Sequence, residues 1–311
     1  MSIQSSNQIL MVRPAAFQYN EQTAESNDYQ HKPPKKQKKE ILQKAIREFD
    51  TMVDLLQSNN ITVHVINDTA KPEKPDAIFP NNWITTHPDG KVFLFPMKNE
   101  NRRIERRSEI VDYLRGNFNV EVVLDWSFYE KDDRALEGTG SMVFDHQRKI
   151  IYACHSSRTD EFLIKKFGKV IGYKPILFHA YKKNGAEQYH TNVVMCVGTA
   201  FAAICLDCIP DEQEKELIVK SIARGGKELI EISREQQEEN FVGNMLELQN
   251  EDGALFLMMS KNAFDSLNAQ QKENLGKHAQ LLHTDLETIE MIGGGSARCM
   301  MAELFLREKE E

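Results

Sequence analysis

The sequence has few cysteines, no long apolar run and no excess of positive charge. Its five cysteines among 311 residues have no framework spacing, which favours a reduced, cytoplasmic protein. The longest mostly apolar run without charge, Val193–Leu206, is shorter than the ~20 residues of a membrane-spanning helix. With 47 acidic and 39 basic residues, the net charge of -8 argues against binding nucleic acid by bulk charge.

Motifs for phosphates, dinucleotides and structural metals are also missing. Neither G-x-x-x-x-G-K-S/T nor G-x-G-x-x-G occurs. Cys205 and Cys208 have C-x-x-C spacing, which is found in zinc and redox sites, but no second pair and no spaced histidine pair accompany them. We therefore expect neither a metal nor a cofactor.

A repeat of about 50 residues is the most informative feature that is present. Four short apolar strands, each opened by a small polar residue, begin at Asn82, Ser141, Asn192 and Asn244, which are 59, 51 and 52 residues apart. A turn, a second strand, an amphipathic helix and a third strand follow in each unit. The second strands are expected at 92–95, 150–153, 201–204 and 255–258, the helices at 103–115, 160–167, 211–223 and 263–275, and the third strands at 120–123, 175–178, 228–231 and 281–283.

The two ends of the chain complete a fifth unit. The N-terminal part supplies a strand at 9–12, a helix at 40–56 and a strand at 61–64, and the C-terminal part supplies a strand at 299–305. Joining them would close a ring of units. The sequence thus predicts an α/β fold, a pseudo-symmetric ββαβ propeller of five units in a single domain spanning residues 1–311. An ordinary α/β sheet with coincidental spacing is the alternative.

One long polar stretch, residues 14–39, interrupts the fifth unit between its first strand and its helix. Long loops in compact domains often serve a function, so this segment could be a lid. A solvated surface loop is the other interpretation.

The repeat places several polar residues at one end of the propeller axis. Because equivalent positions of the units meet there, we expect the starts of the first strands to share a pocket. Those positions carry Asn81 and Asn82, Glu137, His190 and Asn192, and Asn244, and the glycine-rich turn 293–299 brings Arg298 and Cys299.

These residue types suit nucleophilic attack by a thiolate. A cysteine needs a lowered pKa or a nearby base, and histidine can serve as that base near neutral pH. Glu137 and the asparagines offer acceptors to a planar group rich in N–H donors, such as a guanidinium. Each residue alone is more often structural, and only their shared place in the repeat favours a site. Cys154, Cys196 and Cys205 lie in apolar strands and are expected in the core.

The motifs resemble those of the amidinotransferase and arginine deiminase superfamily of guanidine-modifying enzymes, the penteins. They are Met11–Phe17, Phe79–Trp83, Glu137–Ser141, His190–Asn192 and Gly293–Met300, in the family's order and across nearly the whole chain. The pattern is most similar to the citrulline-utilisation hydrolase (CtlX)-like branch.

The resemblance implies roles for the pocket residues. Cys299 would form the covalent intermediate, His190 would act as acid and base, and Glu137 would bind guanidinium nitrogens. Arg298 would help to bind a substrate carboxylate. Asn82 and Asn192 stand where arginine deiminases have aspartates. Since an asparagine carries no charge and both donates and accepts, the reacting end of the substrate could be less cationic than arginine.

We therefore expect a hydrolase of C–N bonds in a guanidino or ureido amino acid, with no nucleic-acid or membrane partner and with a homo-oligomer left open. An amidinotransferase, in which an amine replaces water, shares the first half-reaction. A non-catalytic binding protein on the same fold, similar to a ribosome-binding translation factor, and a cysteine peptidase are the remaining alternatives.

Overall fold

A computed structural model describes residues 3–34 and 37–309, and the chain in it forms five three-stranded sheets. Four of them follow one another along the sequence with the same pattern. In the first of these, β4 pairs antiparallel with β3 and parallel with β5. The next three sheets repeat that arrangement around β7, β10 and β13. The predicted ββαβ repeat is confirmed.

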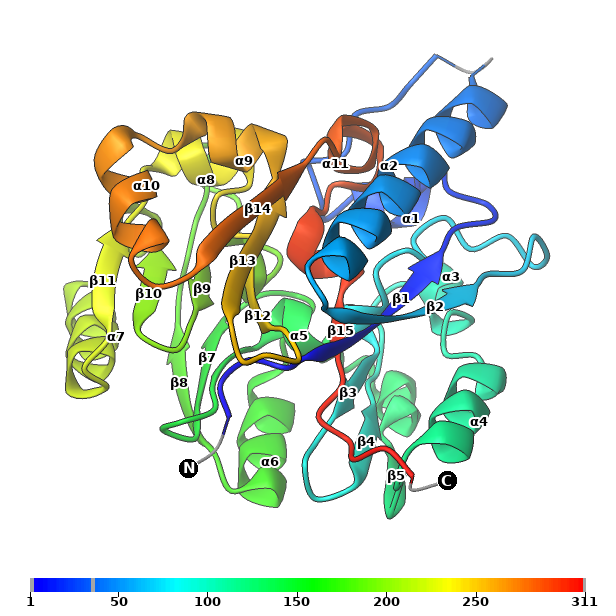
Figure 1. Ribbon diagram of the computed structural model, residues 1–311, viewed down its shortest axis with the longest axis horizontal. Coiled ribbons are helices and arrows are strands. Elements are labelled where there is room, and N and C mark those ends of the chain that lie inside the picture. Colours follow the sequence, from blue (N-terminus) through cyan, green and yellow to red (C-terminus); the bar gives the residue numbers. More distant parts are fainter. Residues whose placement is uncertain (1–2, 35–36, 310–311) are drawn as a thin grey trace.

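The fifth sheet joins the two ends of the chain. Strand β1 pairs antiparallel with β15, with Ile9 opposite Glu303, and parallel with β2. Figure 1 shows β15 in red beside β1 in blue. The split fifth unit expected from the sequence is therefore present.

The elements of each unit have the following bounds. The N-terminal part of the fifth unit has β1 Gln8–Arg13, α1 Glu21–Ala24, α2 Lys38–Ser58 and β2 Thr62–Asn67. The next unit has η1 Pro80–Asn82, β3 Ile84–Thr86, β4 Lys91–Leu94, α3 Glu100–Arg103, α4 Ser108–Asn117 and β5 Val122–Asp125. It is followed by η2 Ser127–Asp132, α5 Gly138–Ser141, β6 Val143–Asp145, β7 Ile150–Cys154, α6 Glu161–Ile171 and β8 Lys174–Phe178.

The second half of the chain continues in the same way. Its first unit has η3 Thr191–Val193, β9 Met195–Val197, β10 Phe201–Ile204, η4 Leu206–Cys208, α7 Glu212–Arg224 and β11 Glu228–Glu231. Its second unit has α8 Arg234–Asn240, β12 Leu246–Gln249, β13 Leu255–Ser260, α9 Lys261–Ser266, α10 Ala269–Gly276 and β14 Gln280–Thr284. The chain ends with α11 Glu287–Gly293, η5 Ala297–Met300 and β15 Ala302–Glu303.

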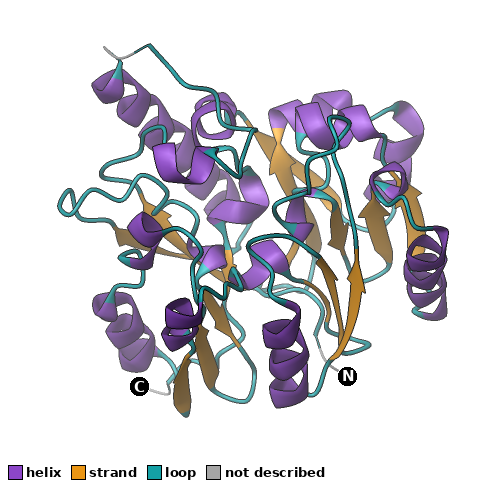
Figure 2. Cartoon of the chain, turned by 180° about the vertical axis from the view of Figure 1, so that it is seen from behind, coloured by secondary structure: helices purple, strands orange, loops and turns teal. Residues whose placement is uncertain are grey.

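The sheets lie inside and the longer helices lie at the periphery. Figures 1 and 2 show this from opposite sides. Helix α2 illustrates how the sequence produces the arrangement, because its buried residues recur every three or four positions and form one apolar face. These residues are Ile41, Ala45, Phe49, Met52, Val53 and Leu56. Neighbouring units touch along their inner strands, β15 against β3, β6 against β9, and β9 against β12.

The first strands begin later than the sequence suggested. The polar residues expected at their starts lie in short helical turns instead, because the backbone there forms i to i+3 hydrogen bonds. The N–H of Trp83 donates to the carbonyl of Pro80 at 3.1 Å, and that of Val194 donates to the carbonyl of Thr191 at 2.9 Å. These turns, η1, α5 and η3, carry the residues of interest just before each strand.

Other boundaries differ for identifiable reasons. The helix expected at 263–275 is two helices, because Asn268 caps α10 by accepting from the N–H of Gln271 at 2.8 Å. The helix expected at 103–115 is divided into α3 and α4, and α8 and α11 were not expected. The strand expected at 299–305 is only β15, because Cys299 lies in the turn η5.

The stretch 14–39 is more ordered than a solvated loop. It contains α1, whose N-cap Asn20 is buried, and α2 already begins at Lys38. Lys35 and Lys36 lie outside the described residues. In the part of the chain that the structure describes, none of the helices has the length and apolar character required to cross a membrane.

Candidate functional site

Four short helical turns meet near the middle of the molecule and surround a small cavity. The turn α5 contacts η1 and η3, and η1 contacts η5. The cavity has a free volume of about 10 Å³, which is the space of about one water molecule. Its walls come from Thr23, Asn27, Asp76, Phe79, Asn82, Arg102, Arg158, Tyr189, His190, the glycines 293–295 and Cys299.

A buried carboxylate orients His190. Nε2 of His190 lies 2.8 Å from Oε2 of Glu137, and neither residue is more than 1% exposed. Since a carboxylate accepts, the proton of a neutral imidazole is on Nε2 and Nδ1 keeps a free lone pair. Burial lowers the pKa of His190 to about 4, although Glu137 opposes this shift. The ring is therefore neutral at pH 7.

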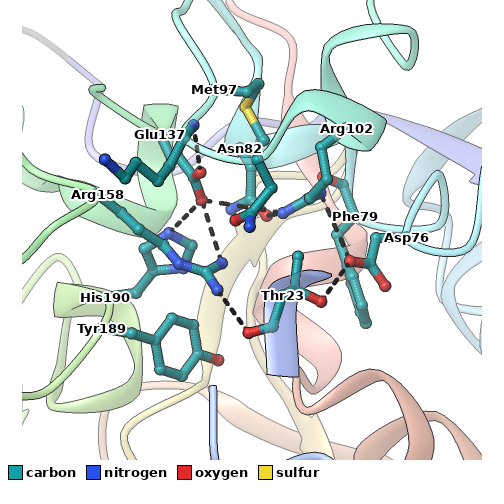
Figure 3. Close-up of polar contacts among 12 residues, drawn as sticks. Thr23, Asp76, Phe79, Asn82, Met97, Arg102, Glu137, Arg158, Tyr189 and His190 are labelled. Carbon is teal, nitrogen blue, oxygen red and sulfur yellow. Dashed lines mark hydrogen bonds and ion pairs between the residues drawn. The ribbon is translucent and has the colours of Figure 1, made fainter. Parts of the chain in front are cut away.

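Glu137 stays ionised although it is fully buried. Burial raises its pKa, but Arg158, His190 and Arg102 together bring the pKa well below its usual value. Nη1 of Arg158 lies 3.4 Å from its Oε2, and Oε1 accepts from the backbone N–H of Lys98 at 3.1 Å. Figure 3 shows dashed lines from the carboxylate of Glu137 to both the His190 ring and Arg158.

Gly140, in α5, lets His190 approach closely. A methyl group at this position would lie 2.7 Å from Nδ1 of His190 and 2.5 Å from Nδ2 of Asn82. Only a residue without a side chain leaves room for this pair, which explains why the motif Glu137–Ser141 needs glycine here.

The thiol of Cys299 lies among amide groups. Its Sγ accepts from Nδ2 of Asn244 at 3.2 Å and from Nδ2 of Asn192 at 3.5 Å. Burial raises the pKa of Cys299 above its ordinary value, although these amides and the charge of Arg298 oppose the shift. The resting residue is thus a neutral thiol that depends on a base, or on a nearby cation, to become a nucleophile.

Asn82 is held by an arginine that sequence reasoning did not single out. Nη1 of Arg102 donates to Oδ1 of Asn82 at 2.8 Å, while its Nε and Nη2 form a fork with the carboxylate of Glu105 at 2.9 Å each. The two hydrogen bonds to Glu105 hold Arg102 in place, and Arg102 in turn orients the side-chain amide of Asn82. Nδ2 of Asn82 has no partner among the described residues, and a methyl group on Gly140 would meet both this atom and the ring of His190.

Arg158 and Asp76 were also missed. The guanidinium of Arg158 lies over the ring of Tyr189, 5.1 Å from its centroid, and its Nε has no partner among the described residues. Asp76 accepts from Nδ2 of Asn20 at 2.7 Å and from Oγ1 of Thr23 at 3.2 Å. Residues 76, 102 and 158 lie in the connections between strands, where no repeat position marks them.

Residues 20–30 cover the cavity, and we call them the covering segment. Nη2 of Arg158 donates to the carbonyl of Thr23 at 3.2 Å and to Oγ of Ser26 at 2.7 Å. Asn27 and Gln30 donate from their side-chain amides to the carbonyls of Gly294 and Gly293 at 3.2 and 3.0 Å. The segment predicted as a lid therefore lies over the glycine-rich turn that precedes Cys299.

Five of the predicted residues do not line this cavity, namely Glu137, Asn81, Asn192, Asn244 and Arg298. Both polar side-chain atoms of Asn81 are buried without a partner among the described residues. Asn192 contacts Cys299 but lines a separate cavity of about 30 Å³, together with Arg298. Arg298 points away from the substrate cavity, because Nη1 donates to the carbonyl of Met301 at 2.7 Å and Nη2 pairs with Glu303 at 2.8 Å. In this position Arg298 cannot bind a substrate carboxylate beside Cys299, and it acts on the thiol through its charge.

The described residues offer no cluster of metal ligands. Within residues 3–34 and 37–309, no three His, Cys, Asp or Glu side chains are placed to hold a metal ion. The predictions of a metal-free and cofactor-free protein stay predictions.

Comparisons with known proteins agree with this architecture. The family model of N,N dimethylarginine dimethylhydrolase, eukaryotic, matches residues 13–306. No curated protein matches the sequence. Among solved structures, the arginine dihydrolase ArgZ of the ornithine-ammonia cycle in cyanobacteria is similar, with a TM-score of 0.75 at 16% identity over 95% of this chain. The chain spans 40% of the length of that enzyme.

Two further structures extend the comparison. The N-terminal domain of ArgZ, covalently bound to a reaction intermediate, has a TM-score of 0.74 at 16% identity, and 96% of this chain and 99% of that domain are covered. DDAH of Pseudomonas aeruginosa, as a mutant complexed with citrulline, has a TM-score of 0.65 at 13% identity, and 96% of this chain and 99% of that chain are covered.

These likenesses confirm the five-unit pentein fold, whereas the citrulline-utilisation branch stays a prediction. The family model matches nearly the whole sequence. The chain belongs to the N,N dimethylarginine dimethylhydrolase family.

Proposed function

We propose that this protein hydrolyses a C–N bond in the side chain of a guanidino or ureido amino acid, with Cys299 as the nucleophile. The observation that carries the proposal is the shared cavity of Cys299 and His190, in which Glu137 fixes the imidazole with its free Nδ1 available. A neutral thiol beside a neutral imidazole can transfer its proton when the sulfur attacks.

The steps use this chain's own groups. Nδ1 of His190 takes the thiol proton as the C–S bond forms on the central carbon of the substrate. The resulting imidazolium, stabilised by Glu137, gives that proton to the leaving nitrogen as the C–N bond breaks. His190 then removes a proton from water, which attacks the same carbon and releases Cys299. Nothing in the site favours an amine acceptor over water, so we propose hydrolysis rather than amidino transfer.

The remaining walls suit the amino-acid end of such a substrate. Within the described part of the chain, Nε of Arg158 has no partner, and Arg158 can present two N–H groups to a carboxylate once the covering segment moves. Oδ1 of Asp76 likewise has no partner in that part of the chain and can accept from an α-ammonium group. Because the free volume admits only about one water molecule, the covering segment must open for a substrate to enter.

Asn82 indicates which chemical group the substrate carries at its reacting end. Its Nδ2 is a donor without a partner among the described residues, while Arg102 occupies its oxygen. A guanidinium has only donors, whereas a ureido group also has a carbonyl oxygen that can accept from Nδ2. We therefore place ureido amino acids such as citrulline ahead of arginine. Hydrolysis of citrulline would yield ornithine, ammonia and carbon dioxide.

Mass spectrometry of the intact protein tests the covalent step. The enzyme is mixed with arginine, citrulline or a methylated arginine, quenched with acid after a short time and weighed. We expect an adduct on Cys299 that is absent from Cys299→Ala and present in Cys196→Ala, the matched control of another buried cysteine. Turnover without any adduct, or turnover by Cys299→Ala, would contradict the proposal. The cytoplasmic location and the single domain also stay predictions.

A further inference from the structure

A pair of thiols lies away from the cavity. Cys205 precedes the short helix η4 and Cys208 ends it, between β10 and α7. Their Sγ atoms are 2.8 Å apart, and neither residue is exposed. Since the sulfurs of a disulfide are about 2.05 Å apart, a bond between them needs an approach of less than about 1 Å. Exposed Asp207 and half-buried Leu206 separate them in the chain.

The two thiols differ in their readiness to ionise. The pKa of Cys205 is lowered, mainly because the side chain of Cys208 donates a hydrogen bond to it. The same hydrogen bond, together with burial, raises the pKa of Cys208. Of the two residues, Cys205 is therefore the one that more readily forms a thiolate, and the thiolate is the form that reacts with oxidants.

A buried ring of hydrogen bonds connects Cys208 with the covering segment. Its Sγ lies 3.2 Å from Oε1 of Gln237, so its one proton can be given either to Gln237 or to Cys205. Nε2 of Gln237 donates to the hydroxyl of Tyr29 at 2.8 Å. That hydroxyl donates to Oε1 of Gln188 at 3.1 Å, and Nε2 of Gln188 donates back to Gln237 at 2.9 Å.

The ring joins two segments that contribute residues to the cavity. Tyr29 belongs to the covering segment, and Gln188 lies two residues before His190. All three members of the ring are at most 7% exposed, so water cannot readily replace a lost partner.

We propose that Cys205 and Cys208 form a reversible disulfide whose formation loosens the covering segment. With hydrogen peroxide as the oxidant, the thiolate of Cys205 attacks one oxygen and becomes a sulfenic acid. Cys208 then forms the S–S bond, and the two sulfurs lose two electrons while the peroxide becomes two water molecules. The disulfide carries no S–H group, so the one proton that Cys208 shares between Cys205 and Gln237 is gone, and Gln237 has no donor on that side once the sulfurs have moved together. This inference goes beyond the proposed function and does not depend on it.

Hydrogen exchange and peptide mapping of the full chain test the inference together. All samples carry Cys299→Ala, so that oxidation of the nucleophile cannot contribute. After treatment with hydrogen peroxide, differential alkylation is expected to show a bond between Cys205 and Cys208 that dithiothreitol reverses. Amide exchange in residues 20–30 is expected to become about fivefold faster, the change for one hydrogen bond of average strength.

Two variants make the outcome decisive. In Cys205→Ser/Cys208→Ser the oxidant should leave exchange in residues 20–30 unchanged. Gln237→Ala should exchange rapidly in the same residues without any oxidant, because it breaks the ring while keeping both thiols. The absence of a 205–208 bond would overturn the redox pair, and a bond without faster exchange would overturn its link to the covering segment. Neither result depends on turnover, so both are separable from failure of the proposed function.

Discussion

Replacing Gly140 by alanine is expected to remove most of the activity while the protein stays folded. The new methyl group would lie 2.5 Å from Nδ2 of Asn82, 2.6 Å from Cε1 of His190 and 2.7 Å from Nδ1 of His190. Ordinary contacts to carbon begin near 3.5 Å, so the imidazole must shift by about 1 Å. A displacement of about 1 Å at a reacting group can cost about 100-fold in rate. We therefore expect kcat to fall about 100-fold, with a stability loss of about 1–3 kcal/mol from overpacking.

The assay for this prediction is ammonia release together with urea unfolding. Gly116→Ala is the matched control, because a methyl group there meets nothing within 4 Å and the position lies in helix α4. The control should keep full activity and gain up to about 1 kcal/mol of stability. A Gly140→Ala enzyme with kcat within threefold of the wild type would refute the claim that His190 acts from this position.

Three other perturbations test separate parts of the site. Asn82→Asp should lower turnover of citrulline at least about tenfold, because the unpartnered amide donor is lost. A gain in citrulline turnover would contradict the preference for ureido substrates. Alkylation of Cys299 by iodoacetamide should accelerate about tenfold per pH unit between about pH 6 and 8. The raised pKa of Cys299 makes the thiolate a minor form whose fraction grows with pH. A rate independent of pH would indicate a resting thiolate. Arg158→Lys should raise KM about tenfold with a smaller change in kcat, since a lysine cannot offer two parallel donors, and an unchanged KM would remove Arg158 from substrate binding.

The repeat made much of the fold predictable from the sequence. Spacings of 59, 51 and 52 residues between equivalent polar positions located four units, and the leftover strands at both ends identified the fifth. The same reasoning predicted that Glu137, His190 and Cys299 would lie together, and the structure places them together. Equivalence between units carries such information because it relates residues that are far apart in the chain.

What lay outside the repeat could not be predicted in this way. Arg102, Arg158 and Asp76 come from connecting segments whose course depends on packing. The direction of Arg298 was also hidden, because successive side chains of a 3-10 turn point about 120° apart. Cys299 therefore lines one cavity and Arg298 lines another. The order of the covering segment depends on buried contacts such as Asn20 with Asp76, which no local pattern reveals.

The most direct test of the central claim is a product-resolved amino-acid assay. The purified enzyme and its Cys299→Ala variant are incubated with arginine, citrulline and methylated arginines, with and without glycine, and ammonia, citrulline and ornithine are quantified. We predict that the wild type releases product without glycine, that citrulline is converted to ornithine and ammonia, and that Cys299→Ala is inactive. Product formed only with glycine, or equal product from Cys299→Ala, would contradict a hydrolase that acts through this cysteine.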